Sequence, residues 1–292
     1  MRKRNSLLYL YSILPSFLIL LFLQGCNIIN PAEPVPGYIR IEKFSITPTP
    51  ALGTDSSKIT DVFVYIDAKF QGSYQLPAQF PVIENGEHEM IFFAGIIVNG
   101  ISNTRTDYPF YDPHQQTVTL EPGKIITINP VVQYADNVVA PWLESFETAA
   151  LSLVKGSGTA IEIVKLPSGD ANNFEGISGA VYLDGSQTHF QVVTDTSYIL
   201  PKGNSGVFLE LNYKCNNSFT VGLVAVSSSS PYSIPIVTLK SKATWNKVYI
   251  ELESTIMAVA DANYFKIYLE AYKESGVTNA EFYFDNFKLL HN

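Results

Sequence analysis

Four histidines, two cysteines and one Ser-x-x-Lys pair are the side chains that would matter most for catalysis or metal binding. The histidines, at positions 88, 114, 189 and 291, are scattered and form no pair at a metal-ligand spacing. Ser152 and Lys155 have the spacing of a known nucleophile pair, but that chemistry needs a helical turn, and this stretch is rich in strand-forming residues. A Gly-x-Ser-x-Gly elbow and a phosphate-binding glycine loop are both missing from the sequence. We therefore predict that the protein is not an enzyme.

Cys26 follows a segment with the layout of a secretory signal. Residues 2–4 are basic, residues 7–23 are apolar, and Gly25 precedes the cysteine. The apolar run contains Pro15 and is shorter than the roughly 20 residues that a membrane-spanning helix needs. The end of this segment, Leu-Leu-Phe-Leu-Gln-Gly-Cys, resembles the signal of bacterial lipoproteins. The resemblance implies that residues 1–25 are a signal peptide, cleaved before Cys26, and that palmitate or a similar acyl chain is attached to this cysteine.

The lipoprotein resemblance also implies a location. It is similar to the outer-membrane lipoproteins of Bacteroidetes-like bacteria, which predicts a protein anchored by lipid in the outer membrane, on either its periplasmic or its surface face. Removing residues 1–25 takes away three of the 19 basic residues and none of the 27 acidic ones, which changes the formal charge from −8 to −11. An acidic chain repels nucleic acid and anionic lipid, so we expect membrane association through the acyl chains alone. Cys215 then has no partner within the chain, and we expect an inert thiol there.

The composition predicts an all-β protein, because aromatic residues make up 13% of the chain and long charged helical runs are missing. Residues 26–37 contain the cysteine and three prolines, and we interpret them as an extended tether. A small N-terminal β-sandwich is expected over residues 38–135. Residues 136–143 are predicted to be a linker, and residues 144–292 a C-terminal antiparallel jelly-roll sandwich.

Within the first domain, residues 61–77 predict two strands around a turn at 67–69. A further hairpin is expected between residues 116–120 and 125–133, across the turn Glu-Pro-Gly-Lys. The stretch 61–95 resembles the PEGA-type repeat through Val-Tyr-Ile-Asp, Gly72, Leu-Pro and Gly-Glu-His. That resemblance implies a structural or surface-interacting module without catalytic residues.

The second domain shows alternation of apolar and polar residues over 207–214, 248–253 and 265–270, which is typical of antiparallel sheets on a shared core. Its opening Glu-Ser-Phe-Glu, its Thr-Trp-Asn-Lys-Val-Tyr and its final Phe-Tyr-Phe-Asp-Asn-Phe resemble the galactose-binding-type jelly rolls of carbohydrate-binding modules. The resemblance implies that the first and last strands lie side by side. It also implies a structural calcium ion held there by Glu147 and Asp285, since carboxylate oxygens suit a hard cation.

Five tyrosines fall on the side of their strands opposite the aliphatic core positions: Tyr249, Tyr264, Tyr268, Tyr272 and Tyr283. Rings on a sheet face can stack on sugars, so these residues are candidate ligand-binding residues. The alternative is that they stabilise a solvated face by cross-strand packing. The sequence thus leaves two functions open for this envelope lipoprotein. It binds carbohydrate or adheres through the jelly roll, or it is a structural or assembly accessory that contacts other envelope proteins.

Overall fold

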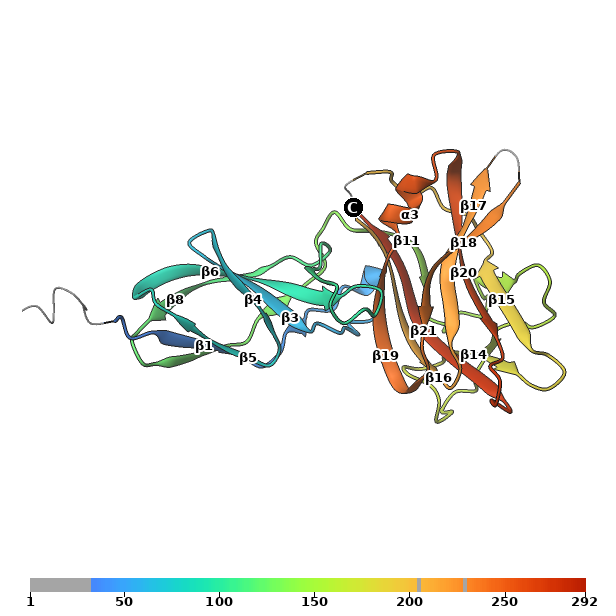
Figure 1. Cartoon of the computed structure of the whole chain (residues 1–292), viewed down its shortest axis with the longest axis horizontal. Coiled ribbons are helices and arrows are strands. Elements are labelled where there is room, and N and C mark those ends of the chain that lie inside the picture. The colour runs from blue at the N-terminus through green and yellow to red at the C-terminus, as the bar shows by residue number, and fades with distance from the viewer. Residues whose placement is uncertain (1–32, 204–205, 228–229) are drawn as a thin grey trace, which may run out of the picture.

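The structure is a computed structural model that describes residues 33–203, 206–227 and 230–292. Figure 1 shows two β units side by side: an elongated N-terminal unit, blue to green, and a larger C-terminal sandwich, from green through yellow to red. The described residues contain one short α-helix, α3 (Glu253–Ala258), and one 3-10 helix, η2 (Pro50–Leu52). The prediction of an all-β fold is confirmed. Cys26 and the signal segment lie outside the described residues.

Within the described part of the chain, no helix has the length and apolar composition needed to cross a bilayer.

The N-terminal unit, residues 33–138, packs two layers against each other. One layer is a five-stranded sheet in the order β4-β3-β6-β7, with β8 also paired to β6. The other contains the three-stranded sheet β5-β1-β9 and the two-stranded sheet β10-β2. The strands are β1 (Gly37–Ile41), β2 (Ser45–Ile46), β3 (Asp61–Ile66), β4 (Lys69–Gln75), β5 (Ala78–Val82), β6 (Gly86–Ile97), β7 (Arg105–Asp107), β8 (His114–Leu120), β9 (Ile125–Ile128) and β10 (Val131–Val132).

The expected turn between β3 and β4 is present, and Asp67 and Ala68 occupy it with positive φ angles of 48° and 62°. The expected hairpin between residues 116–120 and 125–133 is wrong. β8 pairs with β6 in one layer, whereas β9 pairs in parallel with β1 in the other. The intervening turn therefore carries the chain from one layer to the other, a choice that turn residues alone do not reveal.

The C-terminal sandwich, residues 139–292, consists of two facing antiparallel sheets. The first has the order β13-β14-β21-β16-β19, with β11 also paired to β21, and the second has the order β12-β15-β20-β17-β18. The strands are β11 (Val139–Glu144), β12 (Leu153–Lys155), β13 (Val164–Lys165), β14 (Gly179–Leu183), β15 (His189–Thr194), β16 (Val207–Cys215), β17 (Phe219–Ser227), β18 (Tyr232–Leu239), β19 (Lys242–Glu251), β20 (Ala262–Tyr272) and β21 (Ala280–His291).

The core of this sandwich follows from the alternation in the sequence. On β16, Val207, Leu209 and Leu211 face the second sheet, where they meet Phe265 and Ile267 of β20 in one apolar cluster. Because every second residue points the other way, the outer face of each sheet is free to carry polar and aromatic groups. The expected neighbourhood of the first and last strands is also confirmed, since β11 pairs with β21.

The boundary between the two units differs from the prediction. Residues 139–143, which we expected to belong to a linker, form most of β11 and pair with β21. Proline in Val-Ala-Pro-Trp favours a linker, but β11 pairs with only one strand and therefore tolerates a residue that lacks an N–H. The sandwich thus begins at Val139, and the chain passes into it directly from the N-terminal unit.

Candidate ligand-binding pocket between the two units

The N-terminal unit covers part of the outer face of the six-stranded sheet. Phe208 of β16, Tyr249 of β19 and Leu290 of β21 point away from the core of the sandwich and are buried in the apolar cluster of the N-terminal unit. The rings of Tyr108 and Phe208 meet edge to face, with centroids 5.5 Å apart. The two units therefore share one apolar cluster across their boundary, and their relative position is fixed by packing.

A buried carboxylate lies at the centre of this interface. Glu210 accepts hydrogen bonds from the hydroxyls of Tyr108, at 2.6 Å, and Tyr134, at 2.9 Å, both from the N-terminal unit. Its second oxygen lies 2.6 Å from the Lys247 ammonium. Burial alone raises the pKa of Glu210, but the attraction of Lys247 and Lys288 outweighs it and lowers the pKa below its usual value. Glu210 is therefore ionised and held by groups from both units.

Backbone hydrogen bonds join the units beside Glu210. The Asn99 N–H donates to the carbonyl of Tyr249 at 2.8 Å, and the Glu251 N–H donates to Asn99 Oδ1 at 3.0 Å. The Lys58 N–H donates to the Tyr249 hydroxyl at 2.9 Å. Tyr249, a predicted ligand-binding residue, does face away from the core of the sandwich, yet only 1% of it is exposed. Its expected role as a surface ring is wrong, because the N-terminal unit covers it.

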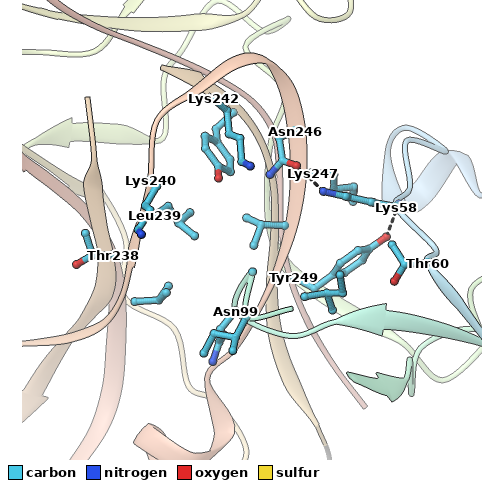
Figure 2. Close-up of a pocket in the computed structure, with 16 residues that line it drawn as sticks. Lys58, Thr60, Asn99, Thr238, Leu239, Lys240, Lys242, Asn246, Lys247 and Tyr249 are labelled. Atoms are coloured by element: carbon cyan, nitrogen blue, oxygen red, sulfur yellow. Dashed lines mark hydrogen bonds between the residues drawn. The ribbon is translucent and has the colours of Figure 1, made fainter. Parts of the chain in front are cut away.

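A pocket of about 500 Å³ opens next to Tyr249, where the two units meet (Figure 2). The N-terminal unit contributes Lys58, Thr60 and the segment 97–101. The sandwich contributes Tyr213, the end of β18 with Lys240, and β19 from Lys242 to Tyr249. Leu239 and Val248 supply apolar surface, whereas hydroxyl, amide and ammonium groups supply hydrogen-bonding atoms. The size falls within the range of small-molecule sites.

The electrostatics of the pocket are set by lysines. Lys58, Lys240, Lys242 and Lys247 line it, and no acidic residue is among the lining residues. The Lys58 ammonium donates to Asn246 Oδ1 at 2.5 Å. Burial, and then the repulsion of Lys242, lower the pKa of Lys58. Lys247 is paired with Glu210, so the other three lysines give the pocket its positive charge.

The other four candidate tyrosines do not gather on one surface. Tyr264, Tyr268 and Tyr272 lie on β20 of the five-stranded sheet, whereas Tyr283 lies on β21 of the opposite sheet. Tyr264 and Tyr272 are exposed, and the Tyr272 ring stacks on His189 with centroids 4.3 Å apart. These rings therefore belong to two separate faces, so they cannot form a single sugar-stacking platform.

Two of those tyrosines are buried in local packing. The Tyr268 ring crosses Gly222 of β17 so closely that a Cβ on this glycine would lie 2.5 Å from it. Tyr283 donates a hydrogen bond to Glu281 at 2.7 Å, and the Lys214 ammonium lies 5.2 Å from its ring centroid. Tyr268 and Tyr283 therefore fit the alternative of cross-strand packing better than that of a sugar-stacking surface.

Glu147 and Asp285, the predicted calcium ligands, both contact the segment 175–178. Glu147 accepts a hydrogen bond from the Ile177 N–H at 2.7 Å, and buried Asp285 accepts one from the Ser178 hydroxyl at 2.7 Å. Burial raises the pKa of Asp285 to about 7, which a bound cation would reverse. Among the described residues, however, no three His, Cys, Asp or Glu side chains gather as metal ligands. The calcium ion remains a prediction.

The remaining reactive side chains carry no chemistry that the structure brings together. Cys215 is buried, and this burial raises the pKa of its thiol to about 11, which agrees with the expectation of an inert residue. His189 pairs with Glu270 at 2.8 Å and His88 with Asp67 at 2.7 Å, on different units. These are separate ion-pair or hydrogen-bond contacts of single histidines.

Sequence reasoning missed the pocket, although one signal for it was present. Lys240, Lys242 and Lys247 fall within eight residues of a chain that is acidic overall. Such a local excess of positive charge at the junction of two strands marks a site where anions gather. The contribution of Lys58 and Asn99 could not be read in the same way, because it depends on how the N-terminal unit docks.

Comparisons with known proteins give similarities of fold only. No protein-family profile matches the sequence, and no curated protein matches it. Solved structures do match part of the chain. A family 11 carbohydrate-binding module of a Clostridium thermocellum cellulosomal cellulase is 18% identical, with a TM-score of 0.36, and the match covers 54% of this chain and 97% of that module.

Two further structures show the same level of similarity. A cleaved adhesin domain of Lys-gingipain from Porphyromonas gingivalis is 13% identical over 53% of this chain and 99% of its own, with a TM-score of 0.37. The enzymatically active domain of a bacteriophage CBA120 tailspike is 10% identical over 47% of this chain, with a TM-score of 0.34. The present chain spans only 18% of the tailspike chain.

Proposed function

We propose that this chain is a non-enzymatic, lipid-anchored protein of the cell envelope that binds a carbohydrate in the pocket between its two units. The observation that supports this is the mixture of surfaces in one cavity of about 500 Å³. Leu239 and Val248 can pack against the C–H faces of a sugar, while Asn99, Asn246 and Thr60 can exchange hydrogen bonds with its hydroxyls. Sites for small polar ligands combine apolar walls with a few placed polar groups in this way.

The amide of Asn246 provides the test of the pocket. We expect Asn246→Ala to weaken glycan retention by the detergent-solubilised protein about 3- to 10-fold, because one neutral hydrogen bond to the ligand is lost. Retention would be measured on an array of plant, algal and bacterial glycans. Asn263→Ala, the same change at an exposed position on β20, is the matched control and should leave retention unchanged.

A second variant distinguishes the pocket from the five-stranded sheet. Tyr272, which is 65% exposed, is the most accessible of the five candidate tyrosines. If Tyr272→Ala abolished retention while Asn246→Ala left it intact, the glycan would bind the sheet face and the pocket assignment would be wrong. If the wild-type protein retained no glycan, the alternative function would take precedence: a structural or assembly accessory whose PEGA-like N-terminal unit and sandwich contact another envelope protein.

The lipid anchor has its own test. The Cys26→Ala variant is expected to lose membrane anchoring completely, because acyl chains are the proposed means of attachment and the acidic chain has no electrostatic attraction to anionic lipid. Phase separation in detergent would place the wild-type protein in the detergent phase and the variant in the aqueous phase. A variant that still partitioned into detergent would contradict the lipoprotein assignment.

A further inference from the structure

We propose that the pocket between the two units selects acidic carbohydrate, with a sugar carboxylate bound by the ammonium groups of Lys58 and Lys242. The inference rests on the proposed function and adds the charge of the ligand to it. Figure 2 shows Lys242, Asn246 and Lys58 in sequence along one side of the pocket, with Asn99 at the opposite end. A uronic acid presents one carboxylate and several hydroxyls, which matches this separation of ammonium groups from amides.

Charge balance in the pocket supports an anionic ligand. Lys247 is neutralised by Glu210, but Lys58, Lys240 and Lys242 have no carboxylate within ion-pair distance among the described residues. Three positive charges facing one cavity repel each other, and a like charge beside an ammonium disfavours its protonated form. This repulsion is felt at Lys58, whose pKa is lowered by burial and also by Lys242. An anion between the two ammonium groups would remove the repulsion and raise that pKa.

The other side of the same interface carries the opposite charge. A second, more open hollow of about 600 Å³ is lined by Asp107, Glu251 and Glu253, with no lysine or arginine among its lining residues. Tyr249 and Asn99 join the two units between these two hollows. The positive charge of the pocket is therefore local, since the net charge of the chain is −8 and its neighbouring hollow is acidic.

The test compares ligands that differ only in charge. Oligomers of galacturonate, glucuronate and sialate would be titrated into the detergent-solubilised full-length protein, each alongside its methyl ester, which keeps the sugar but removes the negative charge. We expect at least one acidic oligomer to bind 10-fold or more tightly than its ester, because hydrogen bonds to charged groups are stronger than neutral ones. Its affinity should also fall as sodium chloride is raised from about 0.05 to 0.5 M.

Variants assign the effect to the pocket. Lys242→Gln should weaken the acidic oligomer about 10-fold and leave the ester unchanged. Lys155→Gln is the matched control, because Lys155 lies on β12 in the other sheet, 54% exposed and 3.3 Å from Glu162. An effect of Lys155→Gln as large as that of Lys242→Gln would mean that the acidic oligomers are held by the overall charge of the protein, which would overturn the inference.

The remaining outcomes separate this inference from the function on which it rests. Equal binding of acid and ester would overturn the inference and leave carbohydrate binding in place. Binding of neutral glycans alone would do the same. Retention of no glycan at all, acidic or neutral, would overturn both. Displacement of the acidic oligomer by inorganic phosphate at the same concentration as by the free acidic sugar would show a simple anion site, which would contradict recognition of a sugar.

Discussion

Replacing Glu210 with alanine is expected to lower the free energy of unfolding by about 3–5 kcal/mol, because it removes the only listed carboxylate partner of one buried ammonium and leaves two tyrosine hydroxyls without their acceptor. Glu210 is fully buried, and its contacts come from both units: Tyr108 and Tyr134 on one side, Lys247 on the other. A loss of this size corresponds to a fall of roughly 10 °C in the melting temperature. Chemical denaturation followed by circular dichroism would measure it.

The matched control is the same substitution in an exposed ion pair. Glu162 lies 3.3 Å from Lys155, with 64% of its side chain exposed, so Glu162→Ala should cost less than about 1 kcal/mol. We also expect the wild-type protein to unfold in one transition, because the shared cluster couples the two units. A small loss for Glu210→Ala, equal to that of the control, would show that the interface contributes little to the stability of the protein.

Replacing Asp285 with asparagine is expected to stabilise the calcium-free protein by roughly 3 kcal/mol at pH 8. Burial raises the pKa of Asp285 to about 7, above the ordinary value of 3.8, so the folded state holds a proton that the unfolded state releases. The wild-type protein therefore keeps this contribution below about pH 4 and loses it progressively as the pH rises to 7. Asparagine has no charge to bury, and the Ser178 hydroxyl can still bond to it.

The difference between wild type and Asp285→Asn should thus be largest above pH 7 and vanish near pH 4. Urea denaturation in the presence of a chelator, repeated across this range, measures it. Added calcium should then stabilise the wild type by about 2.7 kcal/mol at 100 times its dissociation constant and leave the variant unchanged. If the chelator and calcium made no difference to the wild type, the ion predicted at Glu147 and Asp285 would be ruled out. Equal stability of the two proteins at pH 8 would contradict the raised pKa.

The strands and their facing could be predicted because period-two alternation is a local property of the sequence. The run from 207 to 214 placed Leu209 and Leu211 inside and Glu210 outside, and β16 has this arrangement. Tyr249 was likewise placed correctly on the outer face. Its burial could not be predicted, since alternation shows which way a side chain points and not whether another unit covers that face.

The pocket could be predicted even less, because it is made by segments that are far apart in the chain. Lys58 precedes β3, Asn99 follows β6, and Asn246 lies on β19. Their proximity depends on the docking of the two units, which in turn depends on Glu210 finding Tyr108 and Tyr134. The wrong hairpin at 116–133 has a similar cause, because a turn sequence does not specify to which layer the second strand adds.

The shared cluster also sets an order of events during synthesis. Lys288 and Leu290 belong to β21, which follows every other described strand in the chain, yet Leu290 packs in the cluster of the N-terminal unit and Lys288 donates to Tyr134. The N-terminal unit is made first but cannot complete its own packing until β21 has been made. A nascent chain therefore exposes part of that apolar surface throughout the synthesis of the sandwich, and this is the interval in which a chaperone would be needed.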